Sequence, residues 1–87
     1  MNYEKSEIIA LQALAFIAGN EKIMSWMLAE TGVDPRNLSH SADNAEILAG
    51  VLDFLLAHEE ILIDFCAEAN LDATSPARAR QFMPGAP

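Results

Sequence analysis

Residues 13–35 read ALAFIAGNEKIMSWMLAETGVDP, and residues 51–73 read VLDFLLAHEEILIDFCAEANLDA. The two stretches align without a gap at an offset of 38 positions, and seven of the 23 aligned pairs are identical. Several other apolar residues of one copy face apolar residues of the other, as Met27 faces Phe65. A period in this range is typical of a repeated supersecondary unit. The repeat therefore predicts two copies of a helix–turn–helix that bury each other's apolar faces.

Capping and stop signals give the boundaries of the expected helices. Asn2 or Ser6 is suited to cap the first helix, and Asp43 with Glu46 forms a capping box at the start of the third. Glycine or asparagine follows the first, second and fourth helices, where a left-handed residue commonly ends a helix. The expected helices cover residues 8–18, 21–31, 44–57, 59–69 and 77–83.

The expected fold class is all-α, with four main short helices arranged as two repeated hairpins related by a pseudo-twofold axis. A short C-terminal helix completes a single domain over residues 1–83, with repeat units at about 13–35 and 51–73 and a flexible tail at 84–87. Helices 8–18 and 44–57 are apolar almost all round, so we expect both inside the domain. Phe16 and Phe54 should lie near the pseudo-axis.

Composition favours an acidic cytoplasmic protein. The net charge is −8, and residues 37–77 carry eight acids and no lysine or arginine, which disfavours binding to nucleic acids and to membrane surfaces. The single cysteine, Cys66, excludes an intrachain disulfide and fits a reducing compartment. No export signal opens the chain, and its apolar runs are about half a membrane span.

The residues that usually carry chemistry do not form a known pattern. His40 and His58 are 18 positions apart, without the spacing of a metal site, and we expect His58 to be a turn residue that caps the fourth helix. Cys66 falls on a core face with no cation to activate it. No phosphate-binding loop or nucleophile motif is present. We therefore expect no enzyme, no catalytic residue, no cofactor and no metal ligand.

An acidic stripe runs along the fourth helix. Glu60, Asp64 and Glu68 stand four residues apart, and like charges at that spacing repel by roughly 0.2–0.5 kcal/mol per pair. The stripe is either a solvated face or a site for a basic partner. A third possibility is that Arg78 and Arg80 fold back onto it from the tail.

Two large apolar residues lie outside the core that the two copies share. Trp26 and Ile63 each face a polar residue in the other copy. Trp26 either lies flat over the rim of the core or serves as a partner-binding anchor. With the flexible side chains of Met24 and Met27, these residues could form an exposed apolar patch. We therefore expect a homodimer with Trp26 or Ile63 inside the contact.

The runs ALAFIA, TGVDP and VLDFLL carry a family resemblance. Over about residues 7–84 the chain resembles short alpha-proteobacterial proteins of uncharacterised role, the domain of unknown function 3572. The resemblance implies a small helical bacterial protein and supplies no catalytic residue.

The function expected from these observations is a non-enzymatic protein–protein interaction module, an adaptor or regulator that binds itself or another protein. The alternative is a small-molecule or metal-binding accessory protein with a pocket near His58 and Glu60.

Overall fold

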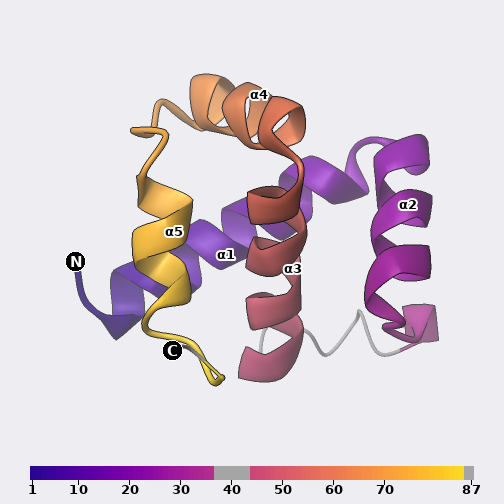
Figure 1. Cartoon of the computed structure of the whole chain (residues 1–87), viewed down its shortest axis with the longest axis horizontal. Helices are drawn as coiled ribbons and strands as arrows, with labels where there is room; N and C mark the ends of the chain where they lie inside the picture. The colour runs from indigo at the N-terminus through magenta and orange to yellow at the C-terminus, as the bar shows by residue number, and fades with distance from the viewer. Residues whose placement is uncertain (37–43, 86–87) are drawn as a thin grey trace.

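The computed structural model describes residues 1–36 and 44–85, and within these ranges it contains five α-helices and no strand (Figure 1). This confirms the predicted all-α class, with four main helices and a short C-terminal one. The twofold symmetry of the two hairpins stays a prediction. The helices are α1 Tyr3–Ala18, α2 Glu21–Thr31, α3 Ala45–Ala57, α4 Glu59–Ala69 and α5 Ser75–Arg80.

Asparagine side chains cap the first three helices. Asn2 precedes α1 and accepts a hydrogen bond of 2.8 Å from the backbone N–H three positions on. Asn20 and Asn44 cap α2 and α3, and each accepts bonds of 3.0 and 3.2 Å from the N–H groups two and three positions on. Such a cap typically contributes about 1 kcal/mol. The predicted capping box depended on Asp43, which lies outside the described residues.

Left-handed residues end two helices as predicted. Gly32 after α2 has a φ of 73°, and Asn70 after α4 has a φ of 56°. The same prediction for Gly19 is wrong, because its φ is −75°. Its N–H still bonds to Ala15 in the helical pattern (3.1 Å), and the extended backbone of Asn20 turns the chain instead. Only Gly32 among these glycines needs the conformational freedom that glycine provides.

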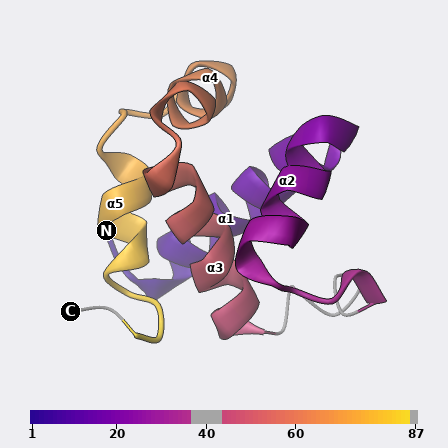
Figure 2. The same ribbon diagram turned by 45° about the vertical axis from the view of Figure 1, so that its right-hand side comes forward.

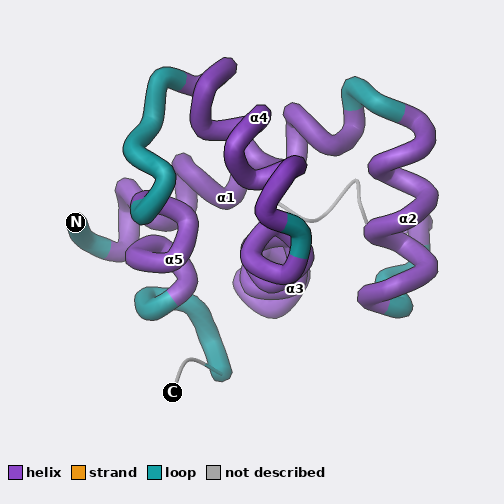
Figure 3. The backbone as a smooth tube through the Cα atoms, turned by 45° about the horizontal axis from the view of Figure 1, so that its top comes forward, coloured by secondary structure: helices purple, strands orange, loops and turns teal. Residues whose placement is uncertain are grey.

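Helix α3 is the centre of the molecule. It lies between α5 and α2 (Figure 2), and a view from above shows it nearly end-on with the other helices around it (Figure 3). Helix α5 packs against both α1 and α3, which places Ala79 and Met83 in the core. The prediction that the third helix lies inside is confirmed by its seven buried residues, Ile47, Leu48, Ala49, Val51, Leu52, Phe54 and Leu55.

Helix α1 is only half inside, which corrects the prediction that it would be surrounded. One face packs against the other helices and buries Ser6, Ile9, Ala10, Ala13 and Ile17. The opposite face is open, and Ile8 there has 50% of its surface exposed. Helix α1 lies behind α3 in Figure 1, so the other helices cover one side of it. A domain of this size has too few helices to enclose two central ones.

The two phenylalanines of the repeat lie in different contacts. Phe16 packs against Phe65, with ring centroids 5.6 Å apart, between α1 and α4. Phe54 packs against Trp26 and His58, between α3 and α2. The expectation that both rings lie at one pseudo-axis is therefore not met, because each hairpin meets a different neighbour.

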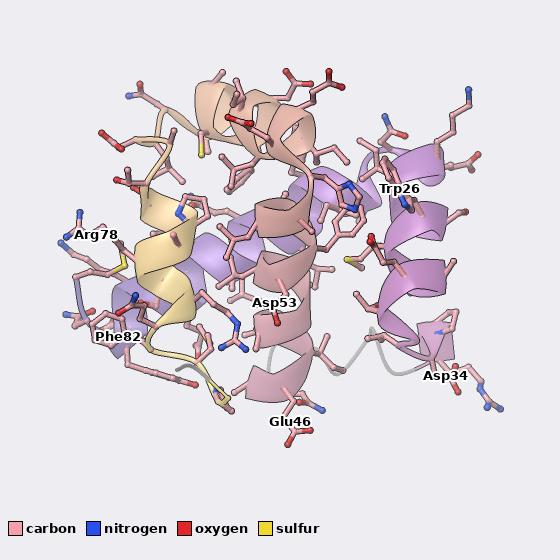
Figure 4. All side chains as sticks on the ribbon, in the orientation of Figure 1. Trp26, Asp34, Glu46, Asp53, Arg78 and Phe82 are labelled. Carbon is pink, nitrogen blue, oxygen red and sulfur yellow. The ribbon has the colours of Figure 1, made fainter. Side chains whose placement is uncertain are left out.

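The tail contacts α3, which rules out the alternative that Arg80 folds back onto the acidic stripe of α4. The Nε and Nη2 atoms of Arg80 donate to the two carboxylate oxygens of Asp53 on α3, at 2.7 and 3.3 Å. Its Nη1 donates to the carbonyl of Pro84 at 3.0 Å. Arg78 lies on the side of α5 that faces away from α3 (Figure 4). Helix α5 runs beside α3 and α1, so its arginines are carried away from α4.

This ion pair gives a prediction of modest size. Asp53→Asn should lower the free energy of unfolding by up to about 1 kcal/mol at low salt, because the pair is partly exposed and screened by ions. Urea denaturation at low and high salt measures the loss, which should shrink as salt rises. Asp64→Asn is the matched control, since Asp64 is exposed and has no ion-pair partner in the described part of the chain. Equal losses in the two variants would contradict the assignment.

Candidate functional site around Trp26

Trp26 lies over the rim of the core at the junction of α2 with the end of α3 (Figure 4). Its ring centroid is 4.2 Å from that of His58 and 5.7 Å from that of Phe54, which it meets edge-on at 85°. His58 in turn lies 4.7 Å from Phe54. Phe54 is 2% exposed and Trp26 47% exposed. This aromatic cluster (Trp26, Phe54 and His58) thus holds one side of the tryptophan in the core and leaves the other in water.

His58 joins this cluster to α2 through an ion-pair geometry that the sequence did not indicate. It occupies the residue before α4, as predicted, but its side chain makes no capping hydrogen bond. Instead its Nε2 lies 2.6 Å from Oε2 of Glu30, one turn after Trp26 on α2. A carboxylate can only accept, so Nε2 carries the hydrogen. With φ at −130° and ψ at 85°, His58 directs its ring towards Glu30 on α2 and makes no bond to the start of α4.

A surface hollow of about 290 Å³ adjoins the aromatic cluster. The start of α4 forms its far wall, which brings Glu60 of the predicted partner surface close to Trp26. Two exposed carboxylates, those of Glu59 and Glu60, therefore line the hollow beside the tryptophan, whereas the carboxylate of Glu30 is bonded to His58. The hollow is lined by Trp26, Ala57, His58, Glu59, Glu60 and Ile61.

The methionines of the predicted apolar patch are not on the surface. Met27 is 1% exposed and belongs to the core, so its assignment to a partner surface is wrong. Met24 is half-buried and packs against that core. Both face inward because α2 places residues 24, 27 and 28 on one side of the helix. The exposed position of Ile63, at 49%, is as the repeat comparison predicted.

The acidic stripe of α4 is divided between two surfaces. Glu60 borders the hollow beside Trp26, whereas Glu68 borders a groove between α1 and α4. That groove consists of two hollows of about 310 and 300 Å³, which share Ala15, Phe16 and Glu68. Asp64 lies exposed between the two surfaces. The stripe is therefore not a single site.

In the part of the chain that the structure describes, the titratable groups with shifted pKa values do not form a catalytic constellation. Burial raises the pKa of the Cys66 thiol, and the negative charge of Asp72 adds to this effect. A nucleophilic cysteine needs the opposite shift. Hydrogen bonds from Arg36 lower the pKa of Asp34, and hydrogen bonds from Thr74 lower that of Asp72. Both carboxyl groups stabilise local turns.

Within residues 1–36 and 44–85, no three His, Cys, Asp or Glu side chains are placed to hold a metal ion. His40 lies outside the described residues. None of the described helices is long and apolar enough to cross a membrane alone. Helices α1 and α2 pass that test only when taken together, and the chain bends by 118° between them.

The sequence singled out Trp26 and suggested a pocket near His58 and Glu60, but it did not predict the contacts of His58 with Trp26 and Glu30. The repeat gave one indication that His58 has a different role, because His58 stands where the first copy has the capping residue Asn20. A residue that no longer caps its helix is free to make another contact. Glu30 carried no comparable signal, since glutamate stands at the equivalent position of both copies.

Comparison with known proteins finds one family. The family model described as "Protein of unknown function (DUF3572)" matches residues 3–86. No curated protein and no solved structure matches the chain.

Proposed function

The chain belongs to the DUF3572 family of proteins of unknown function, and from that premise we propose that it is a small, non-enzymatic protein–protein interaction module. The observation that carries the proposal is the half-exposed Trp26 on its aromatic cluster. Tryptophan is among the residues that contribute most to binding at protein interfaces. Here its ring is already positioned by His58 and Phe54, so binding costs little side-chain entropy.

The charges around Trp26 select the kind of partner. Glu59 and Glu60 line the hollow beside the ring, and Glu30 lies one helical turn after Trp26, on a chain of net charge −8. We propose that the partner is a segment of another protein with lysine or arginine next to an apolar side chain. The apolar group would pack on Trp26, and the cations would face the carboxylates and speed the encounter.

The same charges argue against a twofold self-contact at this surface. Two copies meeting there would bring Glu59 and Glu60 of one copy against those of the other, and opposed like charges cost binding energy. We therefore assign the Trp26 surface to a different protein rather than to the homodimer expected from the sequence.

A designed peptide tests the proposal. The probe is an amphipathic helix of about 18 leucine and lysine residues, five turns long. Trp26 is the only tryptophan in the chain, so its fluorescence reports binding at this surface directly. We expect the emission to change on titration and the calorimetric affinity to fall about tenfold or more in Trp26→Asp.

Two exposed glutamates provide a matched comparison. Glu60→Lys should weaken peptide binding several-fold, whereas Glu46→Lys should change it little, because Glu46 lies at the other end of α3 (Figure 4). Circular dichroism shows that each variant is folded. The proposal fails if the peptide binds wild type and Trp26→Asp equally, or if the two glutamate variants lose the same affinity.

A second candidate function is a small-molecule accessory protein. The hollow beside Trp26 is at the lower end of the size of ligand sites, and an aromatic face beside carboxylates suits a small organic cation. A thermal-shift screen of metals and metabolites separates the two functions. A rise of several degrees with one compound, lost in Trp26→Asp, would favour this candidate, because a ligand that binds only the native state raises stability.

The proposal includes a cytoplasmic location in an alpha-proteobacterium. The family resemblance supports the origin, and the single, buried thiol of Cys66 suits a reducing compartment. Cell fractionation with an antibody against the chain would test the location.

A further inference from the structure

The outer face of α1 is an exposed stripe of uncharged residues. Ile8, Gln12, Ala15 and Gly19 stand at spacings of four, three and four, which places them on one side of the helix. Ile8 at one end is the most exposed large apolar residue in the described part of the chain. Residues 8–19 include no charged side chain, which is unusual on a chain with 13 acids.

The other end of the same stripe is hollowed. Ala15 and Gln12 form one wall of the groove between α1 and α4, with a volume of about 310 Å³ at this point. The rings of Phe16 and Phe65 and the small Ala69 supply apolar surface, and Glu68 stands at the edge. The stripe therefore carries a protruding isoleucine at its N-terminal half and an apolar hollow at its C-terminal half.

We infer that two copies of the chain pair through this face, with their α1 helices antiparallel. Ile8 and Ala15 are seven residues apart, about 10 Å along the helix. A twofold axis that crosses the stripe midway, next to Gln12, places each Ile8 over the partner's Ala15. The same twofold rotation places an isoleucine at each of the two hollows, as an isologous contact requires. A large residue facing a small one lets the helices approach closely.

Charge complementarity supports the same arrangement. Lys5 and Phe16 project within about 20° of each other on α1, so Lys5 lies on the edge of the stripe that borders α4. The twofold rotation that makes the two α1 helices antiparallel brings the α4 side of one stripe beside the α4 side of the other. Lys5 is thereby placed near the partner's Glu68. Both residues are exposed, and neither has an ion-pair partner in the described part of the chain.

A second copy fits this face better than a basic protein does. The stripe itself carries no charge, and the pairing places Lys5 of the second copy beside Glu68 at its edge, so two acidic copies can meet there without opposing carboxylates. The contact is about as long as α1, roughly 24 Å for its 16 residues. Standard interfaces bury about 800 Å² per partner. A contact made by one helix and the groove beside it buries an area at the lower end of that range. We therefore expect a dimer that dissociates in the micromolar range.

The oligomeric state tests the pairing. Light scattering across a concentration series should give a dimer mass for wild type at high concentration and a monomer mass for Ile8→Asp. Trp26→Asp is the matched control, because it makes the same replacement at a similarly exposed residue, and it should remain dimeric. A monomer at every wild-type concentration, or a dimer that survives Ile8→Asp, would overturn the pairing.

A charge exchange tests the orientation. Lys5→Glu and Glu68→Lys should each weaken the dimer about fivefold, and the double variant should recover most of that loss, because the pair is then restored with its signs reversed. Circular dichroism confirms that each variant is folded. Losses that simply add in the double variant would overturn the antiparallel register. This inference is independent of the Trp26 proposal, since Trp26→Asp tests that surface and Ile8→Asp tests this one.

Discussion

Phe54→Ala should lower the free energy of unfolding by about 3–5 kcal/mol, whereas Phe16→Ala should lower it by about 1–2 kcal/mol. The two residues are equivalent in the repeat, but their surroundings differ. Phe54 is buried beneath Trp26, and its removal leaves a cavity in the core. Phe16 is half-buried at the edge of the α1–α4 groove, where water can fill the space it leaves. Urea denaturation at one protein concentration measures both losses.

The loss at Phe54 is large against the total. A domain of 87 residues is expected to have a stability of about 4–13 kcal/mol, so Phe54→Ala removes a substantial part of it and could unfold the chain. Trp26 provides a second readout, because its ring contacts Phe54 and its fluorescence should change in the folded variant. Equal losses at Phe16 and Phe54 would show that the two hairpins bury their phenylalanines alike, contrary to the structure.

Cys66 should react with a thiol reagent at least about a thousandfold more slowly in native buffer than in denaturant. The thiol is buried on the core side of α4, so the reagent reaches it only when the chain opens. Opening to the unfolded state is rare at the stability expected for this domain. The raised pKa of Cys66 slows the reaction further, because only the thiolate reacts. Similar rates in the two buffers would place Cys66 on the surface.

The raised pKa of Cys66 also predicts how the free energy of unfolding depends on pH. The folded state raises the pKa of Cys66 above its unfolded value, so the folded state favours the protonated thiol. Its contribution is fully present below the unfolded pKa, about 8.5, and is lost as the pH rises through the folded value. Wild type should therefore lose stability on the alkaline side more steeply than Cys66→Ala. Parallel pH profiles from denaturation would contradict this linkage.

Local signals in the sequence predicted most of the fold. The bounds of α2 and α4 agree with prediction because the capping residue of α2 and the left-handed stop residues of both helices act on the backbone next to them. Asn20 caps α2, and Gly32 and Asn70 take the left-handed conformation that ends a helix. Burial of Cys66 followed from its place on the apolar side of α4. In each case the deciding interaction is short in sequence or repeats with the helical period.

The contacts that define the candidate site join residues far apart in the sequence. His58 bonds to Glu30 across 28 positions, and Arg80 bonds to Asp53 across 27. No sequence spacing predicts either pair, because the distance between the partners depends on how whole helices pack. Met27 was misplaced for a different reason. Its flexible side chain suits a surface and a core equally well, and only the packing of α2 decides between them.

The place of α5 in the core has a consequence for biosynthesis. During translation the chain emerges from its N-terminus, and Met83, the last of the core residues that follow α3, lies 26 residues after the end of that helix. At about 5–20 residues per second, the ribosome adds these residues in roughly one to five seconds. Until then, Ala79 and Met83 are missing from the core, and the apolar surfaces of α1 and α3 that they cover stay open. In that interval the nascent chain exposes apolar surface of the kind that chaperones bind, and the core is complete only when α5 has joined it.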